Sequence, residues 1–455
     1  MKSKKLIITI IAILAVVVLL FVFIPQLRGI FGGGPSGEDD RVQKIVDAAR
    51  AEEDSVFHVF IDNDAARFFT PKNDPAFFDD FFVMLDSAKS TPVRVTYYGD
   101  SQIEIDRFSC TLRETLQSRF GGGGIGYVPF KNVGTYTSTV SVSPVPNTTH
   151  AYGTPDMKGS GDNYGMAAMA SPLGGGVTLR VATTKADAYA HSHDFTRFTV
   201  MGRGNFSISA CGKSASVNSP GKASRATVVF PATTEASVSV SGSGTLYGVL
   251  VDGDNGVSVD NIPMRGCSGT IFRTINADNL REHYSACNVG LIIMQYGGNV
   301  MPYIKEGASL ENYVANLGKQ IAYLHEISPK SKILFVGPSD MATRKSGSWA
   351  TYPVLPQVVE AIKKVANENG AAYWDIYGVM GGQNSMSKWV SENLAGPDRI
   401  HFTKKGAEKV AQQLSDALMH YYDYYKWRTT PIDVDKYLRA DSIKQAEAAA
   451  KIVKK

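Results

Sequence analysis

The sequence predicts an α/β fold built on a mostly parallel sheet. Short apolar segments that are typical of buried strands alternate with segments of helical length and periodicity, which is the pattern of βαβ units. The expected strands are residues 93–98, 291–296, 332–336 and 372–376, and the expected helices are residues 103–119, 310–325, 355–369 and 404–422. Such sheets carry their sites at the carboxyl ends of the strands.

Residues 140–260 interrupt this rhythm. They are rich in Ser, Thr, Val and Gly, and they alternate with a period of two, for example in residues 177–181, 205–209 and 236–241. Many short alternating strands separated by turn residues predict a small β-sandwich. Because the α/β pattern resumes afterwards, we expect the sandwich to be inserted into the α/β domain, with the α/β parts at residues 91–139 and 261–422.

Composition excludes several classes of protein. Apolar residues make up 44% and charged residues 20% of the 455 residues, which excludes a disordered chain or a protein with many membrane spans. The net charge of +4 is too balanced for an electrostatic nucleic-acid binder. The four cysteines are widely scattered and predict neither a zinc site nor a disulfide scaffold, but their pairing stays open; they are Cys110, Cys211, Cys267 and Cys287.

The amino-terminal residues predict a membrane anchor. Lys2, Lys4 and Lys5 precede an uncharged apolar run over residues 6–24, which at 1.5 Å per residue is just long enough for a hydrocarbon core of about 30 Å. We interpret residues 1–25 as an uncleaved signal anchor and keep a cleaved signal peptide as the alternative. The lysines place the rest of the chain on the extracytoplasmic side, periplasmic or extracellular. Residues 26–90 are then a linker with a helical segment, and residues 423–455 a carboxyl-terminal arm.

Four segments at predicted strand ends contain residues capable of ester chemistry. They are Gly-Asp-Ser101, Arg-Gly-Cys-Ser-Gly269, Gly-Gly-Asn299, and Asp398 followed three residues later by His401. Each alone has an ordinary explanation: a helix cap, a loop, an Asx-turn or a structural histidine. Together they supply a nucleophile, oxyanion donors and an Asp–His pair, and their chance assembly is improbable.

In these four segments the sequence resembles the SGNH (GDSL-type) hydrolase family over residues 91–132 and 260–421. The resemblance implies a three-layer, flavodoxin-like domain in which Ser101 is the nucleophile, His401 the general base and Asp398 its partner. It also implies that the backbone N–H groups of Ser101 and Gly269, with the Asn299 side chain, form the oxyanion hole. No cofactor and no metal are implied.

Two positions qualify the resemblance. Gly266 is a second, less favoured candidate for the backbone donor, and Val300 stands where many members carry Asp or Glu. The glycine-rich residues 120–127 and residues 247–251 resemble the flanks of a carbohydrate-binding β-sandwich that peptidoglycan and polysaccharide O-acetylesterases carry between the first two blocks.

This resemblance implies a serine esterase that removes O-acetyl groups from a cell-envelope glycan, and the amino-terminal residues predict that it is anchored to the membrane. The same triad could instead catalyse O-acetyl transfer to a glycan, with acyl groups received from a membrane partner. A non-catalytic glycan-binding protein is a third possibility. The expected partners are an acetylated glycan and the membrane, and no nucleic acid.

Two further groups have competing interpretations. His191-Ser-His193-Asp194 has ligand-type spacing but no identifiable third ligand, so a polar loop is favoured over a metal site. Four tyrosines near the blocks could stack on sugar rings, but packing is the favoured interpretation; they are Tyr97, Tyr98, Tyr127 and Tyr296.

Overall fold

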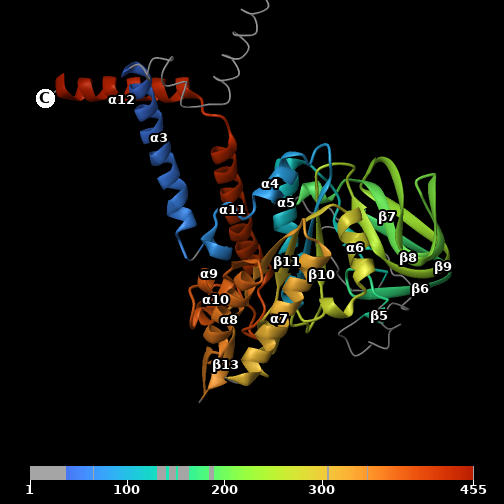
Figure 1. Ribbon diagram of the computed structural model, residues 1–455. Helices are drawn as coiled ribbons and strands as arrows, with labels where there is room; N and C mark the ends of the chain where they lie inside the picture. Colours follow the sequence, from blue (N-terminus) through green and yellow to red (C-terminus); the bar gives the residue numbers. More distant parts are fainter. Residues whose placement is uncertain are drawn as a thin grey trace, which may run out of the picture. The chain divides into compact units, whose positions relative to one another are not determined.

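The computed structural model describes residues 37–64, 66–130, 140–142, 150–151, 163–183, 189–304, 307–345 and 347–453. It divides into two compact units (Figure 1), one containing the described residues 37–59 and 429–453 and the other running from Phe60 to Arg428. In the part of the chain that is described, no helix is both long and apolar enough to cross a membrane. The apolar run over residues 6–24 lies outside the described residues.

The larger unit is built on a six-stranded sheet in the order β1-β15-β12-β11-β2-β10. Its strands are β1 (Phe68–Phe69), β2 (Val93–Gly99), β10 (Val257–Pro263), β11 (Val289–Gln295), β12 (Lys332–Val336) and β15 (Ala372–Trp374). All neighbouring strands are parallel except β1, which pairs antiparallel with β15 at the edge. The parallel strands, numbered along the chain, lie in the order 2-1-3-4-5, which is the flavodoxin-like order.

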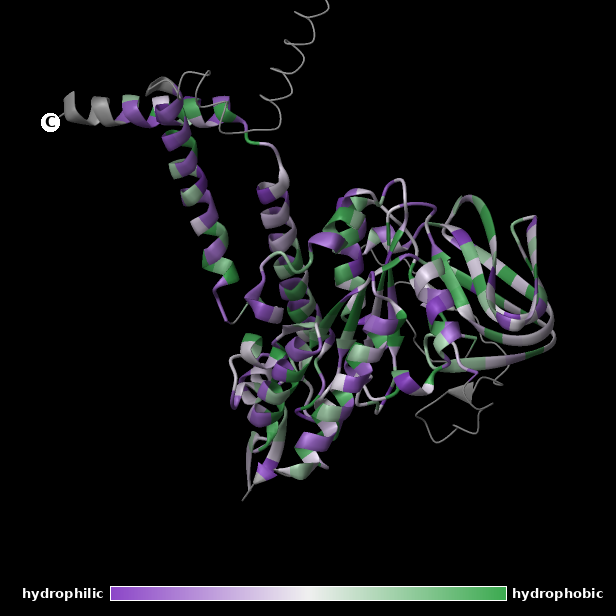
Figure 2. Cartoon of the chain, in the orientation of Figure 1, coloured by the Kyte–Doolittle hydropathy of each residue, from purple (hydrophilic) through white to green (hydrophobic). Residues whose placement is uncertain are grey.

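The central strands are buried on both faces, which explains their continuous apolar sequences. Every residue of β2 and β11 is buried, and hydrophobic residues predominate along the central strands (Figure 2). The four predicted strands are therefore present. Strands β1 and β10 were not predicted, because β1 has two residues and β10 was included in the inserted sandwich.

Helices cover both faces of this sheet. They are α4 (Asp79–Asp86), α5 (Ser109–Phe120), α6 (Ala277–Ala286), α7 (Ala308–Ile327), α8 (Leu355–Glu368), α9 (Ile376–Met380), α10 (Ser385–Ser391) and α11 (Lys404–Thr429). Apolar residues of α6, α7 and α8 share one core with residues of β11, β12 and β15, and α4 and α5 contact β11 and β10. A hairpin, β13 (Ala342–Lys345) and β14 (Ser348–Thr351), follows β12.

One predicted helix is corrected. We expected residues 103–119 to form a single helix, but a 3-10 segment, η2 (Ser101–Asp106), comes first and α5 starts only at Ser109. The backbone breaks at Glu104 and at Ile105, where φ is 62°. Ser101 therefore lies in a short 3-10 turn, so the dipole of a long helix does not act on it.

The inserted region forms a separate antiparallel sheet. Its strands are β3 (Gly126–Val128), β4 (Val140–Val142), β5 (His150–Ala151), β6 (Met169–Thr183), β7 (Phe195–Ala210), β8 (Lys213–Thr233) and β9 (Glu235–Asp252). The period-two pattern correctly predicted antiparallel strands, but we expected many short strands in two sheets. Instead, β6 to β9 are long and paired in one sheet. Glycines that suggested turns lie inside strands, as Gly202 and Gly204 do at a shift in register.

A buried ion-pair cluster joins the two sheets. The Arg94 guanidinium on β2 donates to Asp260 on β10 and, at 2.5 Å, to Asp252 at the end of β9. All three side chains are at most 4% exposed. Removing the cation would leave Asp260 without its ion-pair partner and Asp252 with the more distant Arg197, at 3.7 Å, so Arg94 couples the antiparallel sheet to the parallel sheet.

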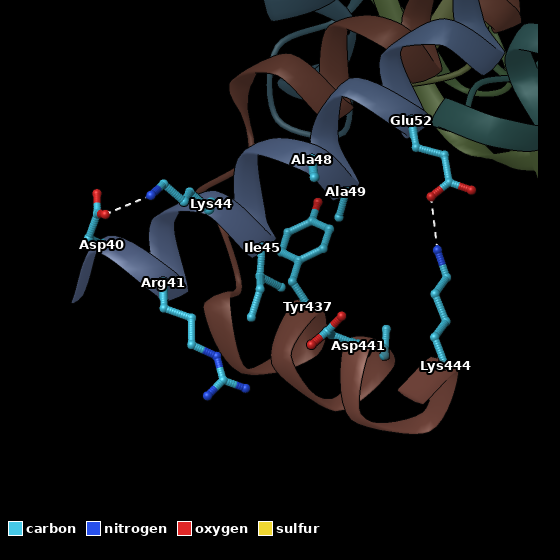
Figure 3. A pocket seen from close by; sticks show the side chains of 11 residues that line it. Asp40, Arg41, Lys44, Ile45, Ala48, Ala49, Glu52, Tyr437, Asp441 and Lys444 are labelled. Atoms are coloured by element: carbon cyan, nitrogen blue, oxygen red, sulfur yellow. Dashed lines mark hydrogen bonds and ion pairs between the residues drawn. The ribbon is translucent and has the colours of Figure 1, made fainter. Parts of the chain in front are cut away.

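The smaller unit contains most of α3 (Gly37–Ile61) and all of α12 (Val434–Val453). Tyr437 and Lys436 on α12 both contact the carboxylate of Glu53 on α3. The two helices border a groove of about 510 Å³ (Figure 3), across which Lys444 pairs with Glu52 at 2.9 Å. The helical segment predicted within residues 26–90 corresponds to α3, and α12 lies in the predicted carboxyl-terminal arm.

Candidate active site

Three side chains form a continuous hydrogen-bonded chain, although Ser101 and His401 are 300 residues apart in the sequence. Ser101 Oγ lies 2.8 Å from His401 Nε2, and His401 Nδ1 lies 2.7 Å from Asp398 Oδ2. The side chains of His401 and Asp398 are 37% and 49% exposed, so the chain is open to solvent. A hydroxyl, an imidazole and a carboxylate in this order are the arrangement that activates a serine for attack on a carbonyl.

The strand order explains why these segments meet. Ser101 follows β2 and Asn299 follows β11, and these strands are neighbours in the sheet. Successive connections leave β2 and β11 toward opposite edges at this point, and such a switch point opens a crevice at the carboxyl ends of the strands. The predicted nucleophile and the predicted side-chain donor therefore lie on the two sides of that crevice.

A tight turn presents the acid and the base together. Asp398 Oδ1 accepts hydrogen bonds from the backbone N–H groups of Ile400 and His401, each at 3.1 Å, and Arg399 between them has φ 60°. Partial burial would raise the pKa of Asp398, but these bonds and the His401 side chain outweigh it and hold the pKa below its ordinary value. Asp398 is thus suited to remain ionised beside the imidazole.

The predicted oxyanion donor Asn299 has two partners. Its Nδ2 atom donates to Asp100 Oδ2 at 2.9 Å and to the carbonyl oxygen of Cys267 at 3.0 Å. An amide nitrogen carries two hydrogens, so each has an acceptor before any substrate binds. Asn299 can bind an oxyanion only by sharing or giving up one of these bonds.

Asp100 is a buried carboxyl directly beside the nucleophile. Burial raises its pKa to about 6; the Gln102 backbone N–H, the charge on His401 and the Asn299 amide counteract this effect. Its side chain bonds Gln102 N and Asn299 Nδ2. Sequence analysis assigned Asp100 no role of its own, because Asp is ordinary in a turn.

Gly269, the predicted backbone donor, occupies a sterically constrained position. Its φ of 82° favours glycine, and a Cβ there would lie 2.9 Å from the Tyr296 ring. Its N–H lies 3.4 Å from the sulfur of Cys267, whose pKa burial raises. A Cβ at Gly266, the less favoured candidate, would meet nothing within 4 Å.

Gln102 is a positioning residue that sequence analysis missed. Its Nε2 donates to the Ile400 carbonyl at 2.7 Å, and its Oε1 accepts from Phe402 N at 3.4 Å. One side chain thus ties the nucleophile turn to the turn that carries His401. The only signal in the sequence is its place directly after Ser101.

The remaining candidates have structural surroundings. The four tyrosines are at most 1% exposed, which agrees with packing; they are Tyr97, Tyr98, Tyr127 and Tyr296. His191 contacts Glu114 at 2.7 Å, and no cluster of three metal-ligating side chains occurs within the described residues. All four cysteines are free thiols.

Comparison with known proteins agrees with this geometry. The profile of the GDSL-like Lipase/Acylhydrolase family matches residues 233–409, a range that includes Gly269, Asn299, Asp398 and His401 but starts after Ser101. Residues 233–409 thus match the GDSL-like lipase/acylhydrolase family. The predicted family is confirmed over these residues, and proteins of this family are acylhydrolases, a class of carboxylic ester hydrolase.

One solved structure shares the fold of this chain. A structure titled "Peptidoglycan O-acetylesterase in action" matches with a TM-score of 0.64 at 18% identity, over 80% of this chain and 99% of that chain. A family two carbohydrate esterase from Cellvibrio japonicus matches with a TM-score of 0.26 at 13% identity, over 63% of this chain and 99% of that one. The comparison with curated proteins gave no match.

Proposed function

We propose that this chain is a serine esterase that removes O-acetyl groups from a cell-envelope glycan through an acyl-Ser101 intermediate. The observation that carries the proposal is the unbroken contact chain from Ser101 through His401 to Asp398. His401 Nε2 takes the proton of Ser101 as Oγ attacks the acetyl carbonyl. Asp398 holds the ring tautomer and stabilises the imidazolium that forms.

The leaving group then departs and water completes the cycle. His401 returns the proton to the sugar oxygen as the C–O bond breaks, which releases the sugar hydroxyl and leaves acetyl-Ser101. A water molecule, deprotonated by His401, attacks the acetyl-enzyme and releases acetate. Donors from Ser101 N, Gly269 N and the Asn299 amide stabilise the negative oxygen in both steps, each by on the order of 3 kcal/mol.

The substrate class is inferred from a structural relative. The fold shared with the O-acetylesterase spans nearly the whole of that protein, which supports acetylated glycan as the substrate class.

We also propose an extracytoplasmic location for the catalytic unit, anchored by residues 6–24. Support comes from the uncharged apolar run and the lysines before it. Anchoring would hold the esterase close to an envelope polymer. A fusion of residues 1–36 to a reporter enzyme that is active on one side of the membrane tests this arrangement.

Replacing Ser101 by Ala tests the activity. The expected result is loss of acetate release from p-nitrophenyl acetate and from acetylated glycan, with an unchanged circular dichroism spectrum. The matched control is Ser118→Ala, because Ser118 is exposed on α5 and bonds only its own helix. Full activity in the Ser101 variant would refute the proposal. If transfer of the acetyl group to an added glycan acceptor is faster than its hydrolysis to acetate, the chain is instead an acetyltransferase.

A further inference from the structure

The hairpin β13–β14 carries an exposed aromatic residue beside the triad. Among the exposed large apolar residues of the described chain, the aromatic ones are Tyr303 and Trp349. They follow β11 and β12, so both lie on loops at the carboxyl end of the catalytic sheet. Trp349 is 38% exposed, although an indole of this size is usually covered in a protein without a ligand for it.

Two guanidinium groups lie against this indole. The Cζ atoms of Arg399 and Arg344 are 4.8 Å and 5.3 Å from the ring centroid. The negative face of an indole attracts a guanidinium cation placed over it. These contacts also restrict the two arginine side chains before a ligand arrives, which lowers the entropic cost of binding.

The charge of these arginines is not neutralised locally. Arg399 donates to the Ser387 hydroxyl at 3.2 Å, and within the described residues neither Arg344 nor Arg399 forms an ion pair with a carboxylate. The hairpin residues 342–351 include Arg344 and Lys345 and no acidic residue. Guanidinium groups with free N–H donors are the groups that bind carboxylates in a bidentate manner.

Backbone contacts connect this cluster to the active site. Ala342 N, at the start of the hairpin, donates to the carbonyl oxygen of Arg399 at 3.1 Å. Arg399 itself lies in the turn between Asp398 and His401. A group bound by these guanidiniums would therefore sit beside the triad, within reach of a substrate whose ester is at Ser101.

We propose that Arg344 and Arg399, held against Trp349, bind a carboxylate carried by the glycan that Ser101 deacetylates. This inference rests on the proposed function and adds to it that the substrate is an acidic glycan. The carboxylate accepts N–H bonds from one or both guanidiniums, and the indole keeps those donors oriented. The site acts mainly on substrate binding, so its loss raises KM more than it lowers kcat.

A matched substrate pair tests the proposal. One member is an O-acetylated oligosaccharide with a uronic-acid carboxylate, and the other is the same oligosaccharide with that carboxylate reduced to an alcohol. We expect kcat/KM to favour the acidic member by at least tenfold at low salt and the preference to shrink as salt rises. Arg344→Gln should reduce the preference about tenfold, and Trp349→Ala should reduce it while Trp349→Phe retains most of it.

The control substitution is Arg180→Gln on β6, an exposed arginine paired with Glu235 in the antiparallel sheet. It should leave the preference for the acidic member unchanged. Equal kcat/KM for both members in the unmodified enzyme, or a preference that survives in Arg344→Gln, would overturn the inference and leave the esterase proposal standing. Acetylated peptidoglycan fragments, whose carboxylates lie on the peptide, show whether the sugar ring must carry the charge.

A binding measurement separates this inference from the proposed function. The Ser101→Ala protein is titrated calorimetrically with the acidic oligosaccharide and with its reduced form. Tighter binding of the acidic form, weakened at least tenfold by adding Arg344→Gln, supports the carboxylate site even if no glycan is hydrolysed. Equal affinity for the acidic and the reduced form, unchanged by Arg344→Gln, refutes the inference. Thermal unfolding of each variant verifies that the substitution in the hairpin leaves the unit folded.

Discussion

Replacing Asp100 by Asn should change the pH dependence of stability by a calculable amount. Burial raises the pKa of this carboxyl from 3.8 to about 6, while the unfolded chain keeps the ordinary value. The unfolded form therefore loses its proton first, and the wild-type protein loses stability as pH rises from about 4 to about 6. A shift of two units corresponds to about 3 kcal/mol.

The Asn variant has no proton to lose at this position, so it does not show this loss. We expect the free energy of unfolding of the variant, measured relative to wild type, to rise by about 3 kcal/mol between pH 4 and pH 8. Denaturant titrations followed by tryptophan fluorescence at each pH provide the measurement. Titrating groups that do not interact with Asp100 are common to both proteins and cancel in the difference. Two stability curves that run parallel across this range would refute the reasoning.

The same variant should also be a poorer enzyme. Ionised Asp100 accepts from the Asn299 amide and its negative charge favours the imidazolium of His401. Without that charge, kcat toward p-nitrophenyl acetate should fall about tenfold, by roughly 1.4 kcal/mol in barrier. The pH–rate profile should also lose the contribution of a group with a pKa near 6. An unchanged kcat and an unchanged pH–rate profile would show that the charge of Asp100 does not contribute to catalysis.

Three other substitutions test the site and the fold. Asn299→Ala should lower kcat by 10²–10³ with a small change in KM, because the lost donor acts mainly on the transition state; a KM effect alone would contradict that role. Gln102→Ala should lower kcat about tenfold in the same ester assay, since the His401 turn loses its tie to the nucleophile turn. Arg94→Met should lower the free energy of unfolding by about 3–5 kcal/mol in denaturant titrations, because buried Asp260 loses its ion-pair partner and buried Asp252 keeps the more distant Arg197.

Strand periodicity predicted the part of the fold that positions the chemistry. Continuous apolar runs at residues 93–98 and 291–296 identified β2 and β11, and the polar residues after them proved to lie at the same edge of the sheet. Periodicity could not predict that β6 to β9 are long strands, because glycine has the same signature in a turn and in a bulge. The start of α5 was misplaced for a similar reason, since Ile105 adopts a positive φ that β-branched residues rarely take.

Residue types identified the candidate triad, but the groups that hold it in place carry no local signal. Gln102 contacts Ile400 and Phe402, which lie 298 and 300 positions further along the chain, and such contacts become visible only once the fold is known. The exposure of Trp349 is likewise a property of the folded surface, because tryptophan in a short strand ordinarily predicts burial. Sequence reasoning therefore finds the reacting groups more readily than the residues that orient them or recognise the substrate.

The bonds around Asn299 suggest how the oxyanion hole is held ready. A free amide would rotate, and the reaction would have to restrict it each time charge develops. Here the Asp100 carboxylate and the Cys267 carbonyl fix the amide from two sides. An oxyanion carries more charge than the Cys267 carbonyl, so it can draw one N–H away from that carbonyl while the bond to Asp100 keeps the amide in place. The donor is then oriented at rest and strengthens its bond only in the transition state, which is the condition for raising kcat rather than substrate affinity.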